Sequence, residues 1–206
     1  MTIAALLRHH GVNVPRFVTV DGRIVFDDVT YTDATLHSHA SLGTVTPVVS
    51  HTFHGGAEEP GIGGDPSAVG WADDDEIRRH IEAMTMAFPS FTYVPPEEDL
   101  NPCWVGVIDT GRGKFRVAVT LRWDRGLPRV AVLGGVRLGV ASGRRWRQSP
   151  HLYDSGNLCV ADSGDWKPEE HTAATVVAWA SHWLAAYTEW RMTRQWPVEG
   201  VRTNVA

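Results

Sequence analysis

Two residues in this chain have the types and spacing for nucleophilic chemistry, namely His151 and Cys159. The run Asp154-Ser-Gly-Asn157 between them is typical of a tight turn, in which Gly156 is expected to take a positive φ. Such a turn would bring the cysteine back toward the histidine. An imidazole beside a thiol can take its proton, or can stabilise the charge that builds up on an attacked carbonyl. From this pattern alone, however, a lone cysteine in an apolar run is more often a small buried hydrophobic residue.

Two helices are predicted around this pair. The first is expected to start at Asp73-Asp74-Asp75-Glu76, where carboxylates suit the free backbone N–H groups, and to end before Pro89. Its apolar residues recur at helical spacing from Ile77 to Phe88. The second is expected to open at Pro168 and to close before Pro197, with apolar residues at three- and four-residue steps between them.

The stretch between the two helices predicts an antiparallel strand meander. Runs of branched and aromatic residues separated by short Gly- and Pro-containing loops indicate three strands: Trp104–Asp109, Lys114–Trp123 and Arg129–Leu133. A possible fourth strand, Val136–Val140, is a weaker prediction because glycines interrupt it.

The N-terminal part has a different composition, and we place a domain boundary near residue 70. Strand-like runs on either side of Asp21-Gly22 predict a hairpin, whereas residues 55–70 are rich in Gly, Pro and Ala and predict a loop or linker. Residues 1–70 are therefore expected to form a β-rich extension of unknown function, and residues 71–206 the main domain.

Composition narrows the classes of function. The formal net charge of −5 argues against a general nucleic-acid binder, and no apolar stretch approaches the length of a membrane span. With 2 cysteines and no secretory leader pattern, a disulfide-framed secreted domain is excluded and a cytoplasmic location is expected. Four histidines have ligand-like spacing, but an all-histidine structural metal site is unusual, so we expect no metal and no cofactor. These histidines are His37, His39, His51 and His54.

The run from Ser149 to Trp196 resembles the catalytic region of the ubiquitin-conjugating enzyme family. That family has a His-Pro-Asn tripeptide, then Ile-Tyr, a Gly-containing turn, a catalytic Cys, and a Trp-x-Pro that opens a helix. The matching residues fall in one register: Ser149-Pro150-His151, Leu152-Tyr153, Gly156, Cys159 and Trp166-Lys167-Pro168. Since the preceding helix and strands come in the family's order, the resemblance covers about residues 71–196. It implies an α+β, UBC-like fold with an added β-rich N-terminal segment.

The chain departs from the family pattern at the tripeptide. His151 stands where the family's Asn is expected, and Ser149 where its His is expected. The bacterial branch of the family often has such a Pro-His-x-Tyr version together with a long, Trp-rich last helix. This chain is similar to that branch, since tryptophans recur in its C-terminal helix.

The resemblance implies that Cys159 carries a ubiquitin-like protein, or another protein's C-terminus, as a thioester and passes it to an amine. His151 would donate a hydrogen bond to the developing oxyanion, and Asp162 or Asp165 would orient or deprotonate the acceptor. Ordinary loop solvation is the alternative interpretation of both acids. Arg78 and Arg79 resemble the basic face presented to an activating enzyme, or else form a solvated helix surface.

The partners implied are a ubiquitin-like protein, a ThiF-type activating enzyme and a deubiquitinase-like protease, in the setting of bacterial antiviral defence. Two other functions stay open. The change to His151 suggests a catalytically silent module that binds a ubiquitin-like protein non-covalently. A Cys–His hydrolase is a third possibility, although the sequence places no third, orienting residue beside the pair.

Overall fold

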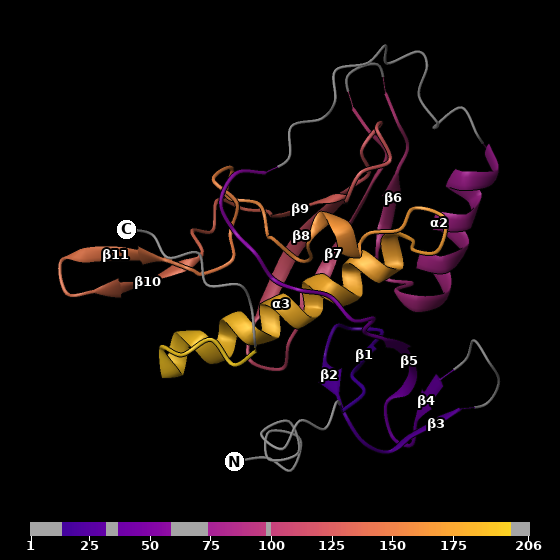
Figure 1. The fold of residues 1–206 in the computed structure, drawn as a ribbon. Helices are drawn as coiled ribbons and strands as arrows, with labels where there is room; N and C mark the ends of the chain where they lie inside the picture. The colour runs from indigo at the N-terminus through magenta and orange to yellow at the C-terminus, as the bar shows by residue number, and fades with distance from the viewer. Residues whose placement is uncertain (1–13, 32–36, 59–73, 98–99, 199–206) are drawn as a thin grey trace.

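The computed structural model describes residues 14–31, 37–58, 74–97 and 100–198 of the chain (Figure 1). At its centre is a four-stranded antiparallel sheet in which neighbours in sequence are neighbours in space. Its strands are β6 (Thr92–Val94), β7 (Cys103–Asp109), β8 (Lys114–Thr120) and β9 (Arg129–Val132). The three predicted strands are confirmed. The edge strand β6 was not predicted from the sequence.

Two helices pack with this sheet, α2 (Asp74–Ala87) and α3 (Ala173–Thr193). Helix α2 has an acidic first turn, as predicted, while Asp73 lies outside the described residues. Helix α3 is buried on almost every side, and a helix that is apolar all round needs neighbours all round. It contacts α2, strand β8 and the N-terminal strands β1 and β2, and in Figure 1 it crosses in front of the sheet.

The predicted start of the second helix was wrong, because α3 begins at Ala173 and not at Pro168. Pro168 lies in a turn that is closed by hydrogen bonds from the amides of Glu170 and His171 to the Lys167 carbonyl. The helix starts where acceptors for its first N–H groups are available. One of these acceptors is the side chain of His80 on α2, and the sequence around Pro168 gives no sign of this distant contact.

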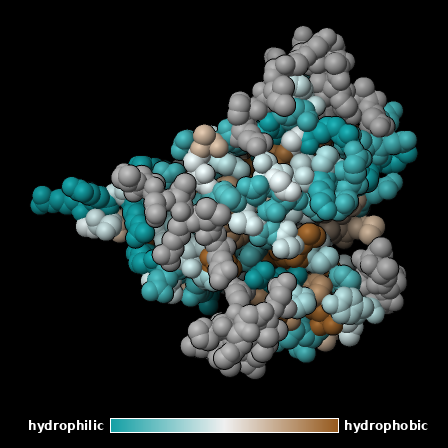
Figure 2. Space-filling view, viewed as in Figure 1, coloured by the Kyte–Doolittle hydropathy of each residue, from teal (hydrophilic) through white to brown (hydrophobic). Residues whose placement is uncertain are grey.

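The region after β9 was also predicted incorrectly. No strand spans Val136–Val140; instead β10 (Gly139–Ser142) pairs with β11 (Arg145–Gln148) in a separate two-stranded hairpin. Gly143, with φ 60°, lies in its turn. The hairpin projects from the body of the molecule in Figure 1, and its tip is hydrophilic in Figure 2.

The N-terminal part forms a five-stranded antiparallel sheet with the order β2-β1-β5-β4-β3. Its strands are β1 (Phe17–Thr19), β2 (Ile24–Val25), β3 (Val29–Tyr31), β4 (His37–His39) and β5 (Gly43–Pro47). The predicted hairpin at Asp21-Gly22 is confirmed, with Gly22 at φ 105°. Val18 and Phe53 belong to the same apolar core as α3, so this part shares its core with the rest of the described chain.

The predicted linker over residues 55–70 is only partly described. Residues 55–58 are not a free linker, because Gly56 pairs with Tyr153 in an isolated bridge and Glu58 binds the loop that contains Cys159. The other predicted linker residues, 59–70, lie outside the described residues. Among the described helices, none is long and apolar enough to cross a membrane.

His80 on α2 joins the two helices. Its Nδ1 accepts a hydrogen bond of 3.0 Å from the amide of Ala173, one of the N–H groups that an α-helix cannot satisfy within itself. Only 2% of His80 is exposed, and burial together with the charges of Arg79 and Arg125 lowers its pKa to about 4. The neutral imidazole is therefore the form that supports the start of α3.

We expect the free energy of unfolding to fall as the pH is lowered from 6.5 to 4. Between pH 6.5 and 4, His80 is protonated in the unfolded chain but stays neutral in the folded protein. The unfolded state therefore binds more protons, and the free energy of unfolding rises with pH. The lowered pKa of about 4 predicts a loss of ~3 kcal/mol for this residue at the acid end. His51, whose pKa burial also lowers to about 4, adds a second contribution. Urea denaturation at a series of pH values measures the slope.

The variant His80→Asn separates the two contributions, because an Asn side chain offers an acceptor near the same position and does not titrate. We expect this variant to be close to the wild type in stability at pH 7.5 and to lose part of the slope between pH 6.5 and 4; the rest of the slope comes from His51, His151 and His171, whose pKa values burial also lowers. An unchanged slope would show that His80 is not the group responsible.

Candidate functional site

The loop from Ser149 to Trp166 folds back on itself as the sequence predicted. The amide of Tyr153 donates to the Asn157 carbonyl at 2.9 Å, and Gly156, at φ 87°, closes the turn with a 2.9 Å bond to the Tyr153 carbonyl. After the turn, the amide of Cys159 donates to the carbonyl of His151 at 3.1 Å. The predicted proximity of Cys159 and His151 is thereby confirmed at the level of the backbone.

His151 has an uncommon backbone conformation, with φ 56°. Its carbonyl accepts two hydrogen bonds, from the amide of Cys159 and from the indole Nε1 of Trp183 at 2.9 Å. Its side chain donates from Nδ1 to the carbonyl of His54 at 2.6 Å, which leaves Nε2 as an acceptor on the neutral ring. Burial lowers the pKa of His151 below its usual range. In this arrangement the ring has no N–H left to offer an oxyanion.

The thiol of Cys159 is fully buried, with 0% of the residue exposed. Burial raises its pKa above the ordinary range, while hydrogen bonds from the Tyr153 side chain and the His54 backbone act to lower it, and the carboxylates of Asp162 and Glu58 act to raise it. The net result is a neutral thiol, which also lies 3.8 Å from the Ala161 carbonyl.

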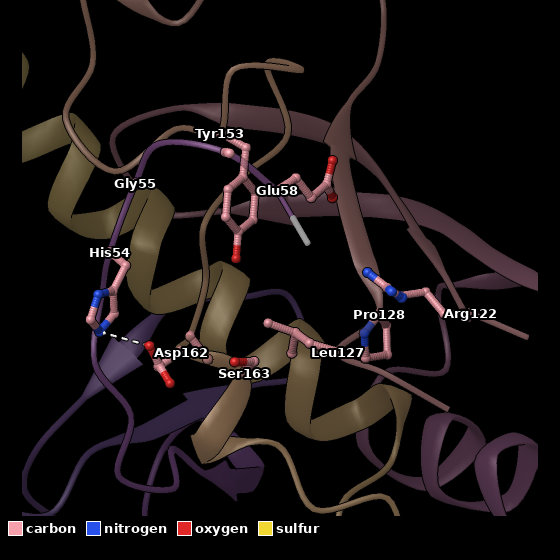
Figure 3. A pocket seen from close by; sticks show the side chains of 11 residues that line it. His54, Gly55, Glu58, Arg122, Leu127, Pro128, Tyr153, Asp162 and Ser163 are labelled. Atoms are coloured by element: carbon pink, nitrogen blue, oxygen red, sulfur yellow. Dashed lines mark ion pairs between the residues drawn. The ribbon is translucent and has the colours of Figure 1, made fainter. Parts of the chain in front are cut away.

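A pocket of about 190 Å³ lies against the Cys159 loop, and Tyr153, Ala161 and Asp162 of that loop line it, whereas the buried Cys159 does not (Figure 3). Several groups that act on the pKa of Cys159 also line the pocket, namely His54, Glu58, Tyr153 and Asp162. In Figure 3 the hydroxyl of Tyr153 points into the space between His54 and Leu127. The pocket therefore combines an aromatic hydroxyl, an imidazole and two carboxylates next to a cysteine.

The two predicted acids occupy different places. Asp162 lines the pocket, its Oδ2 lies 3.1 Å from Nε2 of His54, and its Oδ1 accepts from the Gly164 amide at 2.8 Å. Asp165 does not line the pocket; its Oδ2 accepts from the amides of Thr52 at 2.7 Å and Asp162 at 3.3 Å. Asp162 therefore borders the pocket, whereas the carboxylate of Asp165 binds backbone amides.

The two predicted arginines lie on α2, away from the pocket. Arg78 forms an exposed ion pair of 2.7 Å with Asp75. Arg79 donates to the carbonyls of Pro168 and Glu169, and so ties α2 to the turn that precedes α3. Their proposed contact with an activating enzyme stays a prediction.

Sequence reasoning missed the contribution of the N-terminal part to the site. His54 was considered only as a metal ligand, and Glu58 was placed in a linker. The contact between His54 and His151 spans 97 residues, so no local pattern signals it. The four predicted histidines also do not meet at a metal site. Within the described ranges, three other residues have the spacing of metal ligands, namely Asp27, Asp28 and His39. The two aspartates are exposed and the histidine is half-buried.

Comparison with known proteins identifies a family for most of the chain. The model of the family described as Type II CBASS E2 protein matches residues 80–203, which include the whole loop and Cys159. His54 and Glu58 lie before the matched residues. No curated protein and no solved structure matches the chain.

The bond from Trp183 to the His151 carbonyl predicts a local effect of removing the indole N–H. We expect Trp183→Phe to lower the free energy of unfolding by about 1–3 kcal/mol, from the lost hydrogen bond and the small void. Hydrogen exchange of the Cys159 amide, which donates to the same carbonyl, should become faster.

Trp190→Phe is the matched control, since Trp190 is also buried on α3 and packs against Tyr187 and Arg147. It should cost stability without a selective change at Cys159. Equal effects of the two variants on that amide would contradict the assigned role of Trp183.

Proposed function

Because the chain belongs to the Type II CBASS E2 protein family, we propose that it is the conjugating enzyme of a bacterial antiviral system. It carries a ubiquitin-like protein, or another protein's C-terminus, as a thioester on Cys159 and transfers it to an amine. Its partners are that modifier, a ThiF-type activating enzyme and, for removal of the modifier, a deubiquitinase-like protease.

One observation carries this proposal, which is the set of groups gathered around Cys159. Hydrogen bonding by the Tyr153 side chain and the His54 backbone acts to lower the pKa of the Cys159 thiol and so favours the thiolate, although burial, the largest effect, raises this pKa. The same two residues line the pocket together with the Asp162 carboxylate. A buried cysteine with a purely structural role has no need of two donors and a polar pocket.

In loading, the sulfur of Cys159 loses its proton and attacks the thioester carbonyl on the activating enzyme. A new C–S bond forms, the bond to the sulfur of the activating enzyme breaks, and that departing thiolate takes up the proton. In transfer, the nitrogen of the acceptor amine attacks the carbonyl carbon and the bond to Sγ breaks. The acceptor ammonium, with an ordinary pKa of about 10.4, loses one proton to Asp162, and a second proton from the nitrogen goes to the Cys159 thiolate.

His151 acts in this proposal as a positioning residue. Its Nδ1 donates to the His54 carbonyl, and its own carbonyl accepts from the Cys159 amide. His151 therefore holds both the backbone of Cys159 and the segment that contains His54. The oxyanion contact expected from the resemblance requires a donor that the neutral ring does not present in this arrangement. The Tyr153 hydroxyl, which points into the pocket, is a side-chain donor that could take this role (Figure 3).

Incubation with the activating enzyme and ubiquitin-like protein of the same pathway should give an adduct that thiol reagents release. We expect Cys159→Ala to abolish it, and Cys159→Ser to give an adduct that resists thiol, because an oxyester replaces the thioester. Cys103→Ser is the matched control and should retain the adduct, since Cys103 lies in β7. Gel analysis with and without reductant reads this out. No adduct with a verified partner pair would contradict thioester carriage.

The burial of the thiol favours a second candidate, a module that binds the modifier without forming a bond. Binding of equal affinity by the wild type and Cys159→Ala, with no adduct in either, would support this function over the first.

Asp162→Asn should slow transfer from preloaded enzyme to free lysine by about 10²-fold near pH 7, while loading is unaffected. The difference in transfer rate between the variant and the wild type should become smaller as the pH approaches the lysine pKa of about 10.4, because the amine is then already deprotonated and needs no base. Single-turnover discharge from pH 7 to 10 measures both. Asp165→Asn is the matched control; it should discharge normally at every pH at which it is folded. A deficit that does not change with pH would contradict the role of Asp162.

A further inference from the structure

Residues 51–58 run across the loop that holds Cys159. The segment follows β5, passes along α3 and continues over the turn at Tyr153, and Figure 3 shows His54 and Gly55 on it beside the pocket. The family match begins at residue 80, so this segment lies outside the part of the chain that the family model describes.

The first half of the segment is fixed in the core. The side chain of Phe53 is 2% exposed and belongs to the main apolar cluster. The amide of Thr52 donates to Asp165 at 2.7 Å, and the rings of His51 and His182 are joined by a 3.1 Å bond between Nε2 and Nδ1. This half is a firm anchor.

The second half is held against the Cys159 loop by hydrogen bonds and an ion pair. The His54 carbonyl accepts from His151 at 2.6 Å, the His54 ring pairs with Asp162 at 3.1 Å, and the His54 backbone acts to lower the pKa of the Cys159 thiol. Two residues further on, the Gly56 carbonyl accepts from the Asp154 amide at 3.0 Å. The segment therefore docks as an added strand would, by its main chain.

Glu58 binds the end of the segment to the Cys159 loop and to strand β9. Its carboxylate accepts from the Ser155 hydroxyl at 2.9 Å and from the Asn157 amide group at 3.1 and 3.2 Å, and it lies 3.5 Å from the guanidinium of Arg129. The side chain is only 15% exposed. This one residue holds the turn of the Cys159 loop and the sheet together.

We propose that residues 54–58 are a removable cover on Cys159, docked on the surface that a partner polypeptide takes when the cysteine reacts. The inference rests on the proposed function, because a cysteine with 0% exposure has no path for an incoming carbonyl until something moves. The cover is the piece best suited to move. It lies beyond the Phe53 anchor, contributes two glycines in place of apolar side chains, and is held by hydrogen bonds that a partner's main chain can replace.

The test is the rate at which Cys159 of the full chain reacts with iodoacetamide, followed by digestion and mass spectrometry of the separate cysteine peptides. Glu58→Ala removes the fastening and should raise the Cys159 rate about tenfold or more, as expected for losing hydrogen bonds to a charged group. Gly56→Val should do the same by a different route, since Gly56 sits at φ 97°, which a β-branched residue does not adopt.

Two controls separate a lifted cover from a loosened fold. Cys103 is half-buried in β7 and serves as the internal reference, so its rate should stay constant. Glu189→Ala removes an ion pair of the same kind, with Arg112, and should leave the rate at Cys159 unchanged. A Cys159 rate that is unaffected in both cover variants, or that rises only in step with Cys103, would overturn the cover.

This outcome is independent of the outcome for the proposed function. Labelling reports access to the sulfur and needs no modifier or activating enzyme. An adduct on Cys159 together with unchanged labelling in Glu58→Ala and Gly56→Val would reject the cover and keep the function. Faster labelling without any adduct would keep the cover and reject the function.

Discussion

Helix α3 is buried around almost its whole circumference, and the need to cover it on nearly every side organises the molecule. Buried Trp, Ala and Val side chains face the sheet, the other helix and the N-terminal strands alike. A four-stranded sheet and one helix cover only part of such a cylinder, so the N-terminal sheet and the segment after it cover the rest. Helix α3 therefore needs the N-terminal part to cover its apolar surface. Because the N-terminal part packs on α3, the segment that follows it lies against the Cys159 loop.

The same helix fixes three surrounding segments through polar atoms on one face. Trp179, Trp183 and Tyr187 are four residues apart, so their side chains are stacked along one side of the helix. Their polar atoms bond backbone groups of the segment before the cover, the Cys159 loop and the start of β10: the Val49 carbonyl, the His151 carbonyl and the Gly139 amide. Each aromatic residue thus contributes buried area and at least one directed hydrogen bond, and the Tyr187 hydroxyl also donates to the Gly139 carbonyl at 3.4 Å. The positions of the loop and the cover are set relative to the same rigid helix.

The sequence predicted what depends on neighbours in the chain. The strand meander, the turn at Gly156 and the return of Cys159 to His151 are local, and all three are found. What it could not predict depends on partners far along the chain. The start of α3 depends on His80, 93 residues away, and the pocket depends on His54, 97 residues before His151. No periodicity or turn motif encodes contacts of that separation.

His151 shows how one residue serves both the local and the distant structure. Its φ of 56° lies in the left-handed region, where Asn, Asp and His are found more often than most other residues. The longer imidazole reaches the His54 carbonyl, while the backbone of the same residue receives the Cys159 amide. One residue therefore joins the Cys159 loop to the N-terminal segment. A His at this position gains a partner only because that segment lies over the loop, and the segment in turn is held beside the thiol by that His.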